Sequence, residues 1–268
     1  MGIFGRIDTF ITWFDGVVWG LPLIILILVT GIFLTVRLGL LQVRYLGKAL
    51  KFMVKNEEDG HGEVTSFGAL CTALSATIGT GNIVGVATAI SAGGPGALFW
   101  MILTAFLGMA TKYSEGLLAV KYRTIDEDGH VLGGPFYYIE NGMGVKFRWL
   151  AKIFAFFGAG VGLFGIGTFT QVNGISSAVR NFFDPNMAHT VALFGNDYSW
   201  ATVISCLVLT VCVGMVVLGG IKRIAKVSEI VVPFMAVLYV VLAVIIMVTN
   251  ITAIPAAIVT IVKSAFTG

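Results

Sequence analysis

Six long apolar segments constrain the fold of this chain more than any other feature of its sequence. A helix needs about 20 apolar residues to cross a hydrocarbon core about 30 Å thick. Six segments reach about that length: 17–36, 64–91, 97–118, 149–178, 199–218 and 227–249. Because they are continuously apolar and do not alternate, they indicate helices and not the strands of a barrel. The sequence therefore predicts an all-α polytopic membrane protein.

The composition excludes a water-soluble enzyme. Of the 268 residues, 57% are hydrophobic and 12% are charged, whereas soluble domains are about 45–50% apolar and about 25% charged. The sequence shows no zinc-type spacing, nucleotide-binding loop, catalytic triad or cofactor motif. We therefore expect a protein that is not an enzyme, has no cofactor, and binds no nucleic acid.

The distribution of Lys and Arg predicts the orientation in the membrane. Of the 17 Lys and Arg residues, 14 lie in the stretches 37–55, 112–152 and 222–226. Cytoplasmic loops carry an excess of positive charge. We therefore expect the N-terminus outside and three basic loops in the cytoplasm: 37–63, 112–148 and 219–226.

Residues 1–16 precede the first long apolar segment and have a helical pattern of their own. Ile7, Phe10, Ile11 and Phe14 follow the i, i+3, i+4, i+7 spacing of one helix face. This spacing predicts a possible interfacial helix lying in the membrane surface. A frayed terminus explains the pattern equally well.

The segment 64–91 is longer than one crossing requires, at about 42 Å as a continuous helix. Its middle reads SATIGTGNIVG over 75–85, and each glycine costs about 1 kcal/mol in helix propensity. We therefore predict a broken helix, interrupted at 79–82. Freed carbonyls could bind a cation such as sodium, and the N-H groups of the next half-helix could bind a carboxylate. A close-packing face, Gly81-x-x-x-Gly85, remains the alternative.

The segment 149–178 carries a row of glycines followed by polar side chains. Gln171 lies within it, and a polar side chain in hydrocarbon is costly unless it faces a partner or a wet cavity. Gln171 is therefore a candidate for binding a polar substrate. A hydrogen bond between helices, typically worth less than about 1 kcal/mol, is the alternative.

Four motifs, in order along the chain, resemble one transporter family. They are GTGNIVGV at 79–86, GGPG at 93–96, GGPFYY at 133–138 and GGIKRIAKVSE at 219–229. Together they are similar to the alanine or glycine:cation symporter family, also called the sodium:alanine symporters. This resemblance implies a secondary active transporter of the plasma membrane that couples sodium to the uptake of alanine or glycine.

The resemblance also implies an architecture. The family has the inverted-repeat fold of the leucine transporter, of the amino acid-polyamine-organocation type. In this chain 17–36 would be an extra N-terminal transmembrane helix, 64–249 the five-helix first repeat, and 250–268 the start of the connection to a second repeat. We therefore expect an N-terminal half that needs a complementary repeat or chain in the bilayer to transport.

The resemblance assigns the site residues by the match to the broken helix. The backbone N-H groups beside the break would meet the substrate carboxylate, Gln171 would line the pocket, and sodium, as the coupled ion, would bind oxygen atoms at two sites. The substrate-binding residues are Gly79, Thr80, Gly81 and Gln171, and the cation-binding residues are Ser75, Thr77, Ile78 and Asn82. The competing interpretation is a non-transporting structural or interaction fragment of the membrane.

Overall fold

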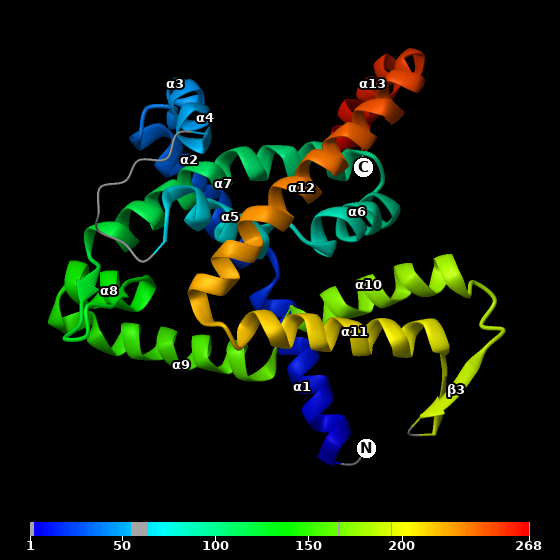
Figure 1. The fold of residues 1–268 in the computed structure, drawn as a ribbon. Coiled ribbons are helices and arrows are strands. Elements are labelled where there is room, and N and C mark those ends of the chain that lie inside the picture. Colours follow the sequence, from blue (N-terminus) through cyan, green and yellow to red (C-terminus); the bar gives the residue numbers. More distant parts are fainter. Residues whose placement is uncertain (1–2, 55–63, 166, 194, 268) are drawn as a thin grey trace.

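Helices build nearly the whole chain in the computed structural model, which describes residues 3–54, 64–165, 167–193 and 195–267 (Figure 1). The first half contains α1 (Ile3–Val18), α2 (Leu21–Arg37), α3 (Leu41–Arg44), α4 (Leu46–Val54), α5 (Ser66–Thr77), η1 (Gly81–Gly85), α6 (Val86–Gly93) and α7 (Gly96–Lys121). The second half contains α8 (Pro135–Met143), η2 (Val145–Phe147), α9 (Arg148–Phe164), α10 (Thr168–Phe183), α11 (Trp200–Val217), α12 (Gly220–Thr249), η3 (Ile251–Ala253) and α13 (Ile254–Thr267).

The described part of the chain holds five helical segments that are long and apolar enough to cross a membrane. They are Gly5–Arg37, Gly96–Lys121, Val145–Phe183, Trp200–Val217 and Gly220–Thr249. A sixth arises if Ser66–Thr77 and Gly81–Gly93, which are bent by 52° at a short break, form one span. The prediction of a helical polytopic membrane protein is confirmed.

The helices differ from the predicted segments at two places. First, α1 and α2 together make the single apolar segment Gly5–Arg37, so the expected helices 1–16 and 17–36 are separated only by a short bend. Second, the segment expected at 149–178 is two helices, α9 and α10. They meet at Gly165 and Gly167, whose φ angles of +60° and +92° suit glycine.

The polar connections contain more structure than the sequence predicted. The strands β1 (Thr124–Ile125) and β2 (Val131–Leu132) pair antiparallel, as do β3 (Thr190–Leu193) and β4 (Asn196–Ser199). The sequence did not predict these two hairpins, because their strands are too short to show a period of two. The predictions for residues 1–2, for 55–63 of the loop 37–63 and for residue 268 concern positions outside the described residues.

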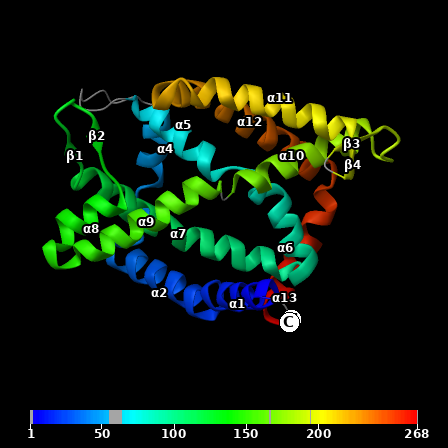
Figure 2. The ribbon, with the colours of Figure 1, turned by 90° about the horizontal axis from the view of Figure 1, so that it is seen from below.

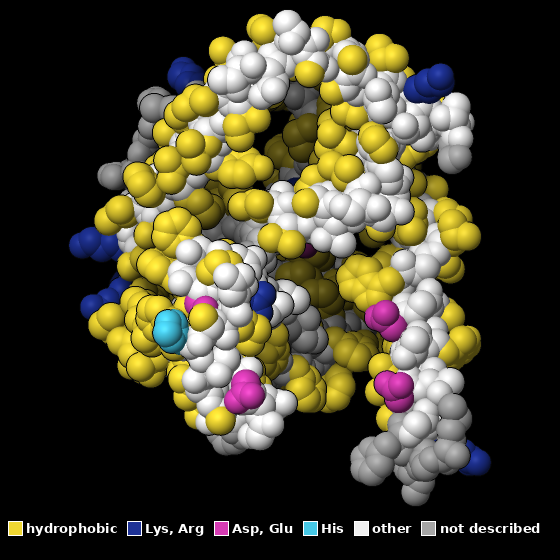
Figure 3. Space-filling view, turned by 90° about the vertical axis from the view of Figure 1, so that its right-hand side faces the viewer, with side chains coloured by type: hydrophobic (Ala, Val, Ile, Leu, Met, Phe, Trp, Pro, Cys, Tyr) yellow, Lys and Arg dark blue, Asp and Glu magenta, His cyan; other side chains and the backbone are white. Residues whose placement is uncertain are grey.

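The helices pack in pairs through small side chains. α5 lies along α12, α2 along α7, and α10 along α11; Figure 2 shows α11 and α12 on one side, α2 on the other, and α5, α6, α9 and α10 between them. The buried apolar residues are mostly small: Cys71, Ala110, Ala151, Ala201, Ala225 and Val232. Large apolar side chains face outward and cover much of the surface seen in Figure 3. This arrangement is typical of helices whose solvent is lipid.

Residues 251–267 fold back onto the start of α7. The indole N-H of Trp100 donates a hydrogen bond of 3.1 Å to the carbonyl of Ala265, and the rings of Phe99 and Trp100 contact Phe266. Gly96 lies so close to Ser264 that a side chain on it would collide with the backbone there. Within the segment 250–268, which we expect to begin a connection, Ile254–Thr267 forms α13 and packs on α7.

A buried carboxylate holds the connection between α10 and α11. Asp184 is 4% exposed and accepts hydrogen bonds from the hydroxyl of Ser199, at 2.6 Å, and from the N-H of Ala188, at 2.7 Å. Because the hydrogen bond from Ser199 favours the charged form most strongly, it lowers the pKa of Asp184 below its usual value of 3.8. The carboxylate therefore fixes the β3–β4 hairpin against α11.

We expect Asp184→Asn to lower the thermal unfolding temperature in detergent, because an amide N-H group replaces one of the two oxygen atoms that accept hydrogen bonds. Folding lowers the pKa of Asp184, so the charged carboxylate stabilises the folded protein fully at pH values above the unfolded-state pKa. This stabilisation is lost as the pH falls through the lower pKa of the folded state. The matched control is Asp197→Asn, at an exposed position of the same hairpin. Equal unfolding temperatures for the two variants would contradict the prediction.

Candidate functional site

The candidate site is the break between α5 and η1. α5 ends at Thr77 because Ile78 adopts an extended conformation, with φ −94° and ψ 109°. The chain resumes as a π-helical turn, Gly81–Gly85, and continues into α6. Single π-helical turns are rare and occur often at functional sites. The interruption predicted from the glycines at 79–82 therefore appears as a bend of 52° beginning at Ile78.

One oxygen atom of α10 enters this break. The backbone N-H and the hydroxyl of Thr80 both donate to Oε1 of Gln171, each at 2.9 Å. These two donors are fixed at the start of a half-helix, where N-H groups lack partners within the helix. Thr80 and Gln171, assigned to the same site from the sequence, are thus in direct contact. In this arrangement Gln171 accepts both hydrogen bonds of Thr80, including the one from the N-H group that we expect to face a substrate carboxylate.

Two glycines permit this contact. A side chain on Gly79 would collide with the amide of Gln171, and a Cβ on Gly174 would lie 2.8 Å from Cγ2 of Thr80. Gly79 was predicted as part of the site, whereas Gly174 was missed. The signal for it is its position three residues after Gln171, which places both on one face of α10.

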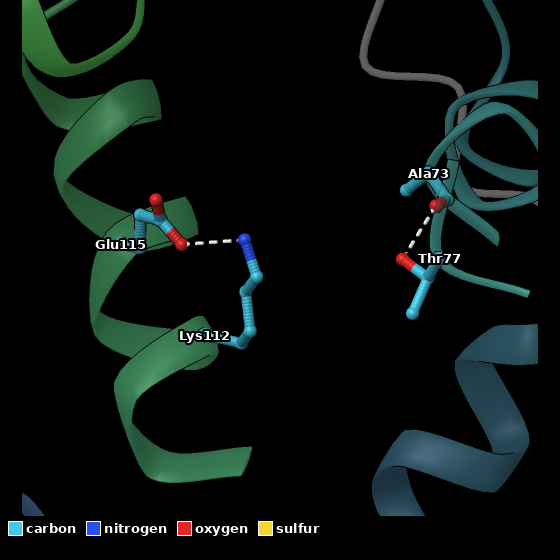
Figure 4. A network of polar contacts seen from close by, with 4 residues as sticks. All are labelled: Ala73, Thr77, Lys112 and Glu115. Atoms are coloured by element: carbon cyan, nitrogen blue, oxygen red, sulfur yellow. Dashed lines mark hydrogen bonds and ion pairs between the residues drawn. The ribbon is translucent and has the colours of Figure 1, made fainter. Parts of the chain in front are cut away.

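The residues assigned to the first cation site also meet. The side-chain amide of Asn82 donates to the carbonyl of Thr77 at 3.1 Å across the break. The hydroxyl of Thr77 instead donates to the carbonyl of Ala73, one turn earlier at 2.8 Å (Figure 4). At the second predicted cation site, the hydroxyl of Ser75 donates to the carbonyl of Thr72 at 2.7 Å. Among the described residues, no hydrogen bond joins Ser75 to Ile78.

The site is open on one side. Ser75, Thr77, Gly81 and Asn82 are exposed, whereas Gly79, Thr80 and Gln171 are half-buried. No residue from 73 to 93 is charged; on α7, Lys112 and Glu115 form an exposed ion pair of 2.7 Å with each other (Figure 4). The break thus offers hydrogen-bond donors to an anionic oxygen and oxygen atoms to a cation. Its own side chains supply no countercharge.

Comparison with known proteins identifies what the chain resembles. A family model described as the sodium:alanine symporter family matches residues 5–268. An uncharacterized transporter of Haemophilus influenzae is 52% identical over 97% of the chain and 53% of the relative. The sodium/alanine symporter AgcS of Methanococcus maripaludis is 48% identical, over 93% of the chain and 52% of the relative. A putative sodium/proton-dependent alanine carrier, YrbD of Bacillus subtilis, is 40% identical over 96% of the chain and 49% of the relative. The chain spans about half the length of the curated relatives it matches.

We expect Gln171→Leu to loosen the break, because the N-H of Thr80 loses its acceptor. Hydrogen-deuterium exchange of the Thr80 amide should accelerate roughly two- to tenfold, as expected for a net hydrogen bond of about 0.5–1.5 kcal/mol. The matched control is Thr170→Val, because the hydroxyl of Thr170 bonds only within its own helix turn, to Gly167. Unchanged exchange at Thr80 in the Gln171 variant would show that this contact does not hold the break.

Proposed function

The chain belongs to the sodium:alanine symporter family, and we propose that it forms part of a carrier that couples sodium to the uptake of a small neutral amino acid, alanine or glycine, across the plasma membrane. One observation carries this proposal: two donors of Thr80 converge on a single oxygen inside a break of an apolar span. Transporters place substrate and ion sites at such interruptions of transmembrane helices.

In this proposal the substrate carboxylate takes the place that Oε1 of Gln171 has beside Thr80. The N-H groups of Thr80 and Gly81 and the positive end of the half-helix dipole attract the carboxylate. Gly79 and Gly81 let a ligand approach the backbone closely because they carry no side chain. Gln171, displaced from Thr80, turns its amide toward the substrate. The close approach of Gly79 to Gln171 supports a small substrate.

Sodium would bind next to the carboxylate. The carbonyl of Thr77 and the side-chain oxygen of Asn82 form the first site once the Asn82 amide turns its oxygen toward the ion. The carbonyls of Ser75 and Ile78 form the second. The N-H of Asn82 donates to the carbonyl of Gly79 at 3.0 Å, so one hydrogen bond joins the cation residues to the substrate residues. Each ligand then strengthens binding of the other by linkage.

The open side of the site supports a complementary half. We propose that 64–249 is the first repeat of a leucine-transporter-like fold, with 17–36 as an additional helix. The half of the relatives' length that this chain does not span would then cover the exposed Ser75, Thr77 and Asn82. The basic loops 37–63, 112–148 and 219–226 would face the cytoplasm.

Two alternatives remain distinct from this proposal. The printed name of YrbD mentions both sodium and protons, which raises proton coupling as a second possibility for the ion. A non-transporting structural or interaction fragment would use the same small residues only for helix packing. The second alternative predicts that neither alanine nor sodium binds.

Uptake of radiolabelled alanine into proteoliposomes tests the proposal. The chain is reconstituted alone and with a polypeptide that supplies the other half of the relatives' length, each with an inward sodium or choline gradient. We expect uptake only with both halves and only with sodium. Uptake by the chain alone would contradict the complementary half, equal uptake in choline would contradict sodium coupling, and none with both halves would favour the structural fragment.

Asn82→Leu tests the cation site. In the same two-part reconstitution we expect sodium-driven uptake to fall at least about tenfold, because Leu has a similar size but no oxygen ligand. The matched control is Asn250→Leu, whose amide also donates to a backbone carbonyl, that of Ile246 at the end of α12. Normal uptake by Asn82→Leu, with membrane insertion equal in both variants, would refute the assignment.

A further inference from the structure

A groove lies away from the transport site, between the short helices α3 and α4 and the side of α7. Figure 1 shows α3 and α4 next to α2, near one end of α7. The groove has a volume of about 490 Å³, within the about 300–1,000 Å³ common for ligand pockets. It is lined by Leu41, Gln42, Tyr45, Leu46, Lys48, Ala49, Phe52, Met109 and Tyr113.

The base of this groove is held by hydrogen bonds of Gln42. Gln42 is 7% exposed, and its Nε2 donates to the hydroxyl of Thr35 on α2 at 2.8 Å and to the carbonyl of Phe106 on α7 at 3.1 Å. The Gln42 side chain therefore joins α3 to two long helices. Its own Oε1 is buried and has no hydrogen-bond partner among the residues that the structure describes. The two hydrogen bonds of Nε2 therefore hold this side chain in place at the base of the groove.

The rim of the groove is cationic. Residues 37–55 contain five Lys and Arg residues and no Asp or Glu. The ammonium of Lys48 lies 5.3 Å from the ring centre of Tyr45, and the guanidinium of Arg44 lies 5.7 Å from the same ring. Both cations are close enough for attraction by the ring face. Tyr45 thus gathers two positive charges at the edge of the groove.

The walls of the groove are apolar and exposed. Leu46 is 54% exposed, Phe52 51% and Met109 48%, although all three line the groove. An apolar wall beside a cationic rim is complementary to an amphiphile with an anionic head. Basic pockets beside transmembrane helices bind the head groups of anionic lipids.

We propose that this groove binds one anionic phospholipid. Lys48 at the rim contacts the phosphate, and an acyl chain lies along Leu46, Phe52 and Met109. Phosphatidylglycerol, which carries one negative charge at its phosphate, has the head-group charge that this rim favours. The bound lipid holds α4 against α7 and so stabilises the position of the two short helices that follow α2.

Native mass spectrometry of the protein, released from bilayers of equal phosphatidylglycerol and phosphatidylcholine, tests this site. We expect the wild-type chain to retain phosphatidylglycerol preferentially. Lys48→Gln should weaken that retention about fivefold. Ala49→Trp, which fills the groove without changing its charge, should abolish retention of the tightly held lipid, and the milder Ala49→Leu should reduce it. Circular dichroism checks that each variant remains helical.

The matched control is Lys51→Gln. It removes the same charge from the same helix, but Lys51 does not line the groove, so retention should stay within about twofold of wild type. If Lys48→Gln and Lys51→Gln lost phosphatidylglycerol equally, retention would depend only on the overall surface charge, and the proposal would be overturned. Equal retention of both lipids, or normal retention in helical Ala49 variants, would also overturn it. Loss of the lipid on adding the other half of the carrier would assign the groove to a protein contact instead.

Discussion

The requirement that backbone polar groups find partners inside an apolar span governs this structure. Where α5 stops at Thr77, the chain leaves the regular helix and the N-H groups that follow lose their partners within it. In a membrane-spanning segment such groups must be bonded by the protein itself or face a water-filled cavity. The side chain of Gln171 meets this requirement by accepting from both donors of Thr80. This contact requires α10 to lie beside the 52° bend, and it requires glycine at positions 79 and 174, where a side chain would collide.

The other end of α5 is held by a different helix. Glu229 on α12 accepts a hydrogen bond of 3.0 Å from the hydroxyl of Thr65, the residue that caps α5. A side chain on Gly68 would collide with the Glu229 carboxylate. A carboxylate at the start of a helix is also favoured by the helix dipole. α12 therefore holds the start of α5, and α10 holds the break that follows its end, so a shift between those two helices would act on the break.

The spans and the break could be predicted because each follows from local sequence: about 20 apolar residues, or glycines placed where a helix would otherwise continue. The meeting of Thr80 with Gln171 joins residues 91 positions apart, and no local rule gives the rotation of α10 that produces it. Gly174 shares a face of α10 with Gln171, but its contact with Thr80 also depends on that rotation. The β3–β4 hairpin was missed because its strands have only four residues each, too few to show alternation.

The lack of charge around the break bears on why the proposed substrate and ion should bind together. A carboxylate placed beside Thr80 would gain charge-assisted hydrogen bonds, roughly twice as strong as those now made to the neutral amide of Gln171. It would also leave water for a region in which no residue from 73 to 93 is charged, and an unpaired buried charge is costly. Sodium at Thr77 and Asn82 would offset that cost. In the proposed carrier, coupling therefore arises because sodium places a positive charge beside the carboxylate end of the zwitterionic substrate, where the break supplies none.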